Sequence, residues 1–287
     1  MTNARLLFVH ALSPLHAGTG QGVGVIDLPV ARERATGLPY LPGSSLKGVL
    51  RDACGDRDIR EKVFGPDTNR ANDHAGSVQF SDQRLLLLPV RCLRGTFAWV
   101  TSPYILRRFV RDARSAGIED VPSQVPTPAR DDECMVSDGE CKIAVGEQVI
   151  LEDLDLRAEA HSDVTQWGQW LGERVFPNET AWQSMLTTRL CVVSDEVMDF
   201  LLTTATEVVA RIKLLEDAKT VKKGGLWYEE ALPIETVLCG LVVATPIKAT
   251  PDEVFTTIEN LTAKPLQLGG KATVGRGLCR LRLVGGE

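Results

Sequence analysis

The amino-acid sequence predicts an α+β fold in which one body carries inserted arms. The first 117 residues read in the order strand, helix, strands, helix, according to the spacing of their apolar residues. Further along, two extended segments flank a basic tip that contains glycine, which is typical of a projecting hairpin. No internal repeat of about 20 to 50 residues is visible, which argues against a solenoid.

The N-terminal elements follow from local patterns. Residues 6–12 are apolar except for His10 and predict a strand, and residues 13–24 are expected to form a glycine-rich loop. Pro42-Gly43 then breaks the chain before a helix, for which Ser44 or Ser45 is the expected N-cap. The apolar stripe of this helix consists of Leu46, Val49 and Leu50.

The later elements complete a single domain that spans residues 1–287. Helices are expected at 105–116, 164–175, 195–204 and 251–261. Strands are expected at 77–80, 84–90, 143–156 and 278–283. Residues 118–142 contain three prolines and several acids, and they predict an exposed acidic insertion. Residues 208–237 predict the hairpin, with its basic tip at 219–225.

Charge is segregated along the chain. The formal net charge is −6, but residues 130–163 alone hold eleven acidic and three basic residues, so the rest of the chain sums to +2. Two stretches, 211–223 and 264–283, are locally basic and could face a polyanion, although any one charge run is more often an ordinary solvated surface.

Several classes of protein are excluded or disfavoured. No apolar run is long enough to span a membrane. The N-terminus shows no signal-peptide core, and the seven cysteines are scattered without a Cys-x-x-Cys pair, so we expect reduced thiols in a cytoplasmic protein. No zinc-ligand spacing and no nucleophile elbow of a serine hydrolase is present.

The glycine-rich stretch near the C-terminus favours phosphate binding. Four glycines (Gly269, Gly270, Gly275 and Gly277) surround Lys271 and Arg276, so backbone N–H groups can approach phosphate oxygens without steric interference from a Cβ. The spacing fits neither a dinucleotide fingerprint nor a P-loop. The alternative, which is about as probable for an isolated motif, is a glycine-rich turn before an edge strand.

A single carboxylate, Asp27, follows the N-terminal loop that carries His16. One aspartate and one histidine can assist a proton transfer or hold a divalent ion loosely, but they cannot build a two-metal centre. A nucleophile that the substrate already contains, such as an RNA 2′-hydroxyl, would suit so sparse a site. The alternative is that Asp27 only forms a turn.

Five segments together resemble one known family, the backbone RAMP subunits of type III-B CRISPR effector complexes. The segments are 10–20 (HALSPLHAGTG), 24–30 (GVIDLPV), 42–52 (PGSSLKGVLRD), 226–233 (LWYEEALP) and 269–277 (GGKATVGRG). The third and fifth mark the RAMP superfamily as a whole, whereas the second and fourth point to this subunit.

The resemblance implies a ferredoxin-like, RRM-like body with a protruding thumb hairpin. It implies copies assembled head to tail, together with other subunits of the effector complex, along a CRISPR guide RNA. Target RNA would be cut at regular intervals by Asp27 with a divalent cation, Mg²⁺ or Mn²⁺, and without an organic cofactor. His16, Tyr228 and Glu229 would assist.

The same resemblance implies a set of RNA-binding residues spread over three segments. These are Ser44, Ser45, Lys47 and Arg51 on the first helix, Lys222 and Lys223 in the hairpin, and Gly269, Gly270, Lys271, Arg276 and Gly277 in the glycine-rich loop. Three other hypotheses stay open: a type III-A RAMP backbone, a non-catalytic RNA-binding scaffold, and a stand-alone RAMP nuclease that processes guide precursors.

Overall fold

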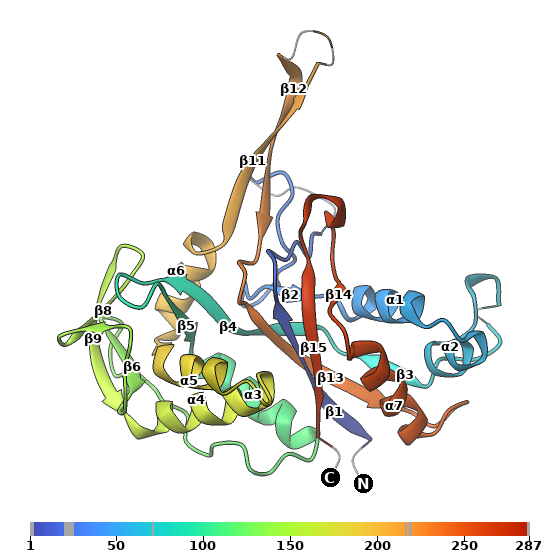
Figure 1. The fold of residues 1–287 in the computed structure, drawn as a ribbon, viewed down its shortest axis with the longest axis horizontal. Helices are drawn as coiled ribbons and strands as arrows, with labels where there is room; N and C mark the ends of the chain where they lie inside the picture. The colour runs from blue at the N-terminus through green and yellow to red at the C-terminus, as the bar shows by residue number, and fades with distance from the viewer. Residues whose placement is uncertain (1–2, 20–25, 71, 216, 218–219, 286–287) are drawn as a thin grey trace.

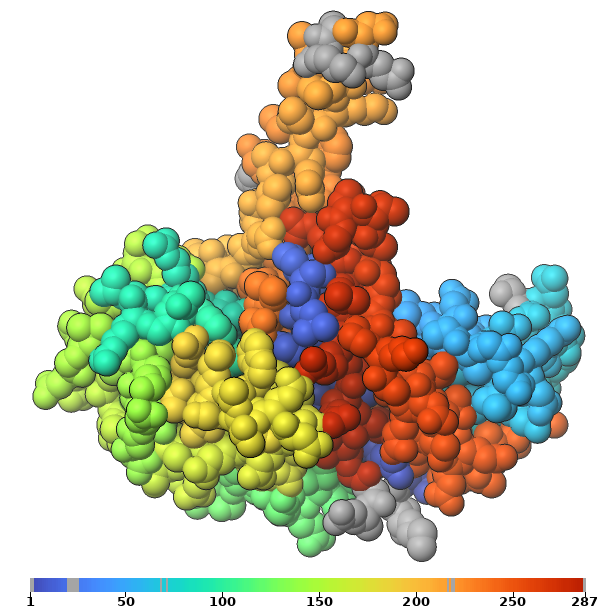
Figure 2. Space-filling model, in the orientation of Figure 1, coloured from blue at the N-terminus to red at the C-terminus, as the bar shows by residue number. Residues whose placement is uncertain are grey.

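A computed structural model describes residues 3–19, 26–70, 72–215, 217 and 220–285 (Figure 1). It confirms the α+β class: the described residues form a large mixed sheet of 13 strands and a separate two-stranded sheet. The two-stranded sheet is a hairpin that projects away from the body, as the ribbon and the space-filling view both show (Figures 1 and 2).

The strands and helices have the following bounds. The strands of the body are β1 (Ala4–Ala11), β2 (Tyr40–Leu41), β3 (Val78–Phe80), β4 (Gln83–Arg91), β5 (Phe97–Thr101), β6 (Glu133–Ser137), β7 (Ala144–Val145), β8 (Gln148–Leu151), β9 (Leu154–His161), β10 (Leu190–Val193), β13 (Val237–Ala244), β14 (Leu266–Gln267) and β15 (Leu278–Val284). The hairpin consists of β11 (Glu207–Leu214) and β12 (Val221–Ala231). The helices are α1 (Gly43–Ala53), α2 (Arg57–Phe64), α3 (Pro103–Ser115), α4 (Ser162–Val175), α5 (Thr180–Arg189), α6 (Asp195–Thr204) and α7 (Pro251–Thr262).

One half of the large sheet is antiparallel, in the order β15-β1-β13-β4. Along the chain its elements run β1, α1, β4, β13, α7, β15. Successive residues of a strand point to opposite faces, yet Leu6, Leu7, Phe8 and Val9 in β1 are all buried. Both faces of this strand are therefore covered, with α3 packed across β1, β4 and β13.

The other half of the sheet grows from the far end of β4. Leu88–Arg91 of β4 pair with β5, and β10, β6, β9, β8 and β7 follow in that order. Helices α4 and α5 pack on this half, where Trp167 of α4 is fully buried. Because β4 belongs to both halves, the two halves form one continuous sheet.

The prediction of an exposed insertion at 118–142 is wrong at its start and at residues 133–137. Ile118 and Val121 are buried, and β6 lies inside the sheet between β10 and β9 with every residue buried. The apolar pattern Cys134-Met135-Val136 allows this, because these residues form one of the sheet's interior strands. Residues 127–132 and 138–142 are largely exposed, as predicted.

The prediction that Ser44 or Ser45 caps the first helix is also wrong. The N-cap of α1 is Pro42, without a side-chain hydrogen bond, and the helix begins at Gly43. Gly43 N donates to Asp82 Oδ1 over 2.9 Å. A Cβ at Gly43 would lie 2.4 Å from the Phe80 carbonyl oxygen, so glycine lets the helix start one residue early against the turn between β3 and β4.

Within the described part of the chain, no helix is long and apolar enough to cross a membrane.

A candidate nuclease and RNA-binding site at the base of the hairpin

The segment that carries Asp27 is hydrogen-bonded to the base of the hairpin. Leu28 N donates to the Tyr228 carbonyl over 3.1 Å, and Glu230 N donates to the Leu28 carbonyl over 3.0 Å. These bonds form a parallel bridge between Leu28 and Glu229. The Asp27 segment thus pairs with the edge of strand β12, and the hairpin fixes the position of the segment.

Asp27 itself is exposed. Its Oδ2 accepts a hydrogen bond from Tyr228 N over 2.8 Å. Its other carboxylate oxygen has no partner among the described residues. One oxygen therefore fixes the side chain, while the second is available to a substrate.

Glu229, by contrast, is buried, at 4 % exposure, and is surrounded by donors. Its Oε1 accepts from Lys271 Nζ over 2.8 Å and from Trp227 Nε1 over 2.7 Å, and Arg211 Nε lies 3.4 Å from Oε2. Burial alone would raise the pKa of Glu229, but the hydrogen bonds and the charges of Lys271 and Arg211 outweigh it and lower the pKa to about 2. This carboxylate stays ionised and joins the hairpin to the glycine-rich loop.

His16 also connects the hairpin to the glycine-rich loop. It is buried, at 7 % exposure, and its Nδ1 lies 2.6 Å from the Glu230 carbonyl oxygen. The His16 carbonyl accepts a hydrogen bond from Gly270 N over 2.9 Å. A Cβ at Gly18 would lie 2.6 Å from Nε2, so the ring is tightly packed. In this position His16 holds the loop and the hairpin together.

Glu230 is a site residue that the sequence analysis did not single out. Its Oε2 accepts from Val30 N over 2.9 Å, and its Oε1 lies 2.5 Å from Arg32 Nη2. Arg32 also donates to the carbonyls of Leu202 and Gly37. Glu230 therefore fixes the far end of the Asp27 segment. Glu229 and Glu230 follow one another in an expected strand, where neighbouring side chains point to opposite faces. One of the two acids must therefore face the interior, which is a weak signal of such a role.

The glycine-rich loop contains several residues in the left-handed backbone region, among them Gly269, Lys271, Gly275 and Gly277. At Gly277 a Cβ would lie only 2.0 Å from the Leu268 carbonyl oxygen, so this position accepts glycine alone. Arg276 is buried beneath the loop, where its Nη2 donates to Glu207 Oε1 over 2.9 Å. Its Nε and Nη1 have no hydrogen-bond partner among the described residues.

The other predicted RNA-binding residues belong to segments that are distant from the glycine-rich loop in the sequence. On α1, Lys47 is half-buried without a described partner, and burial, followed by the charge of Arg51, lowers its pKa. Arg51 instead donates to the Gly65 carbonyl and pairs with Asp67 over 2.7 Å. Ser44 is exposed and Ser45 half-buried on the first turn of α1. Lys222 and Lys223 are exposed near the hairpin tip.

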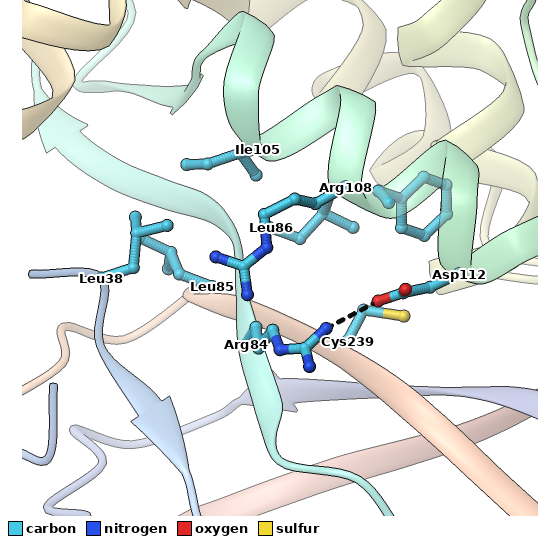
Figure 3. Close-up of a pocket in the computed structure, with 9 residues that line it drawn as sticks. Leu38, Arg84, Leu85, Leu86, Ile105, Arg108, Asp112 and Cys239 are labelled. Carbon is cyan, nitrogen blue, oxygen red and sulfur yellow. Dashed lines mark hydrogen bonds and ion pairs between the residues drawn. The ribbon is translucent and has the colours of Figure 1, made fainter. Parts of the chain in front are cut away.

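Three cavities lined by described residues lie in this part of the body, and they differ in size. The one between α3 and β4 has a volume of only about 20 Å³, room for about one water molecule, and its Arg84 is paired with Asp112 (Figure 3). The second has a volume of about 460 Å³ and lies between the Asp27 segment and α6. The third has a volume of about 240 Å³ and lies between α6 and the start of α3. Among these three, the second has the volume that is typical of a small-molecule site.

Comparison with known proteins identifies the family. The sequence matches the RAMP superfamily over residues 8–280. The chain belongs to this superfamily. It is 35 % identical to the CRISPR system Cmr endoribonuclease Cmr4 of Pyrococcus furiosus, an alignment that covers 98 % of this chain and 95 % of the relative. It is 26 % identical to the CRISPR system CMR subunit Cmr4 of Saccharolobus solfataricus, over 98 % and 96 % of the two chains.

Solved RAMP structures share the fold. The crystal structure of oligomeric Cmr4 from Pyrococcus furiosus superposes with a TM-score of 0.76 at 30 % identity, covering 98 % of each chain. A chain of the type III-B Cmr-beta complex bound to cognate target RNA superposes with a TM-score of 0.75 at 22 % identity, covering 98 % of this chain and 96 % of that one, which supports the fold alone.

The donor set of this RAMP site limits how it could hold a metal ion. Among the described residues, no group of three His, Cys, Asp or Glu side chains is arranged to bind a metal. One free oxygen of Asp27 fits an ion that keeps most of its water and takes further ligands from phosphate, as Mg²⁺ does. The described residues thus fit a divalent cation that is held by one carboxylate oxygen.

Proposed function

We propose that this chain is the backbone subunit of a cytoplasmic type III-B CRISPR effector complex that binds guide RNA and cleaves complementary target RNA at regular intervals. One observation carries this proposal: an exposed carboxylate, Asp27, is fixed beside the hairpin in a chain that is 35 % identical to a Cmr endoribonuclease over nearly its whole length. Its body is ferredoxin-like, which the β1-α1-β4-β13-α7-β15 order supports.

The cleavage chemistry follows from the sparse site. The 2′-oxygen of the target ribose bonds to the adjacent phosphorus while the bond from phosphorus to O5′ breaks, which leaves a 2′,3′-cyclic phosphate and a 5′-hydroxyl. The proton of the 2′-hydroxyl passes to the free oxygen of Asp27, and O5′ takes a proton from water. The protein contributes orientation and one proton acceptor.

A divalent cation, Mg²⁺ or Mn²⁺, would be held by Asp27 together with phosphate oxygens. When bound, it would neutralise negative charge on the phosphate. Glu229 stays ionised but faces Lys271 and Arg211, so its role is to hold the hairpin base. His16 and Glu230 keep Asp27 in place from the two sides of the segment. Tyr228 contributes its backbone amide, and its exposed ring is free to contact RNA.

Guide RNA would be held by backbone amides of the glycine-rich loop and by cations that no described carboxylate neutralises, namely Lys222 and Lys223 in the hairpin and Lys47 on α1. Copies of the chain would follow one another head to tail along the guide, as a heterologous interface allows. The presence of oligomers in the crystal structure of the Pyrococcus relative supports this arrangement. Specificity would then come from pairing with the guide, so no base-reading code is needed in the protein.

The test is Asp27→Asn in the assembled complex. We expect target cleavage to fall by about a thousandfold or more, while affinity for target RNA changes by less than about twofold. Asp153 is also exposed and lies in the turn between β8 and β9, so Asp153→Asn is the matched control and should cleave normally. Undiminished cleavage by Asp27→Asn would show that the chain is a non-catalytic scaffold. Cutting of guide precursor by the isolated chain would support the stand-alone nuclease instead.

A further inference from the structure

The cavity between α6 and the start of α3 contains no residue of the candidate nuclease site among those that line it. Leu38, Met198 and Leu202 are buried and supply its apolar walls. Its volume of about 240 Å³ is smaller than the roughly 300 to 1,000 Å³ of typical small-molecule sites. The cavity therefore suits one long side chain better than a whole small molecule.

Two carboxylates of α6 line this cavity. Asp195 and Asp199 are one helical turn apart, so they lie on the same side of the helix, and both are exposed. Asp195 Oδ1 accepts a hydrogen bond from Tyr104 N over 2.9 Å, and its other carboxylate oxygen has no partner among the described residues. Asp199 has neither a hydrogen bond nor an ion pair within the described part of the chain. Both carboxylates thus keep acceptor oxygens free.

A third acceptor of the cavity is buried. Ser102 lines the cavity, is the N-cap of α3 and is only 2 % exposed. A serine at an N-cap normally accepts a hydrogen bond from an amide of the first turn, but here Asp195 accepts from Tyr104 N and Ser102 makes no side-chain capping bond. Its hydroxyl therefore has no partner among the described residues. Because a buried hydroxyl without a partner is costly, this group indicates that the cavity binds a polar group.

The charges around the cavity favour a cation as its occupant. A cation close by, Arg108, lies 5.3 Å from the centre of the Tyr104 ring but binds both carboxylate oxygens of Glu33, over 2.6 and 2.8 Å. These hydrogen bonds raise the pKa of Arg108 and lower the pKa of Glu33, so both groups stay ionised and neutralise each other. Asp195 and Asp199 have no such counter-ion among the described residues. An occupant must therefore bring positive charge, which disfavours RNA.

We propose that this cavity binds an arginine side chain of a neighbouring protein subunit. A guanidinium carries five N–H donors in a planar fork, so it can bind Asp195, Asp199 and the Ser102 hydroxyl together. Its methylene groups pack against the three apolar walls. A lysine ammonium is a point charge with three donors and matches such separated acceptors less well. This inference goes beyond the proposed function, because it does not depend on RNA cleavage.

The first experiment measures the binding of a model side chain to the isolated full-length chain. The probe is Nα-acetyl-arginine amide, and its control is Nα-acetyl-citrulline amide, which keeps the shape but replaces the guanidinium with a neutral urea. An NMR titration gives the Kd of each. We expect saturable binding of the arginine probe, at least about tenfold tighter than binding of the citrulline probe, because only the first carries the charge that the carboxylates attract.

Matched variants show where the probe binds. Asp199→Asn keeps the size of the side chain and removes its charge, and it should weaken binding of the arginine probe about fivefold. Glu196→Gln makes the same kind of change at an exposed residue of α6 that does not line the cavity, and it should leave the Kd unchanged. Ser102→Ala should weaken binding about threefold.

Three results of this titration would overturn the proposal. They are the absence of saturable binding, equal affinities for the arginine and citrulline probes, and equal weakening by Asp199→Asn and Glu196→Gln. The last result would mean that the probe responds only to the general charge of the surface.

The second experiment identifies the source of the arginine. Asp199→Arg places a guanidinium of the chain itself at the site, and it should lower incorporation of the chain into the assembled complex about tenfold relative to Glu196→Arg, measured by native mass spectrometry. Loss of self-association would assign the arginine to a second copy of the chain, and loss of contact with a different subunit would assign it to that subunit.

Equal incorporation of Asp199→Arg and Glu196→Arg would overturn a protein side chain as the occupant. Tighter binding of spermidine than of the arginine probe would do the same, because it would assign the cavity to a free polyamine. None of these measurements requires RNA cleavage, so a complex that does not cut its target would overturn the proposed function and leave this test intact.

Discussion

The two basic regions of the molecule differ in how their charge is used. At the base of the hairpin, Lys271 and Arg211 face Glu229, and Arg276 faces Glu207. Near the tip, Lys222 and Lys223 are exposed and have no carboxylate partner in the described part of the chain. Only a cation that is not already neutralised releases counterions when it meets a phosphate. The base therefore uses its charge to hold the fold, and the tip keeps its charge for a polyanion.

The largest effect is expected from breaking the charge cluster at the base. Glu229→Gln should lower the free energy of unfolding at pH 7 by about 3 kcal/mol, the amount that corresponds to a pKa lowered from 4.5 to about 2. Because the pKa is lower in the folded protein, this contribution is present above pH 4.5 and is lost as the pH falls to about 2. Urea unfolding of both proteins at several pH values measures the difference, which should shrink across that window. A difference that does not depend on pH would contradict the ionic role of Glu229.

The contrast between base and tip predicts different salt dependence of RNA binding. The double variant Lys222→Ala, Lys223→Ala should weaken binding about tenfold near 0.1 M salt and reduce the slope of log K against log salt by about 1.4, since each lost phosphate contact contributes about 0.7 on single-stranded RNA. Lys271→Ala should leave that slope nearly unchanged. Filter binding to guide RNA across a salt series tests both. Equal slopes for the double variant and for Lys271→Ala would show that the cations at the base and at the tip of the hairpin do not differ in their contacts with RNA.

A smaller effect of the same kind is expected on α1. Lys47 has no described partner, whereas Arg51 is bound to Asp67 and to the Gly65 carbonyl. Lys47→Ala should weaken RNA binding about threefold, and Arg51→Ala should leave binding unchanged while lowering stability by about 1 kcal/mol. Binding and unfolding measurements on both variants check this. A larger loss of RNA binding in Arg51→Ala than in Lys47→Ala would show that RNA displaces Asp67 from Arg51.

Much of the fold could be predicted because its signals are local. The helix expected at 251–261 is present as α7, and Thr250 and Glu253 form a capping box at its start. The terminal alternating strand is present as β15, and helices at 164–175 and 195–204 correspond closely to α4 and α6. Helix α2 was missed, although Asp56 caps it and Gly65 ends it. It is short and strongly charged, so its apolar stripe is weak.

The parts that could not be predicted depend on contacts between distant segments. Nothing near Arg276 in the sequence reveals that Glu207 neutralises it, and the pairing of Arg32 with Glu230 joins residues 198 positions apart. Asp27 could be singled out as an isolated acid in a loop, but its hydrogen bond to Tyr228 spans 201 positions. A glycine-rich motif indicates where a backbone can approach phosphate. It does not indicate whether the neighbouring cations are free.

The docking of the Asp27 segment on β12 has a mechanical consequence. The Tyr228 amide that holds Asp27 belongs to the same continuous strand that runs outward to the hairpin tip. We expect a twist or bend of the outer part of the hairpin to shift the Asp27 carboxylate, because one strand joins the two. The proposed cleavage residue is thus attached to the part of the molecule that projects farthest from the body, and the shape of whatever binds there would alter its position.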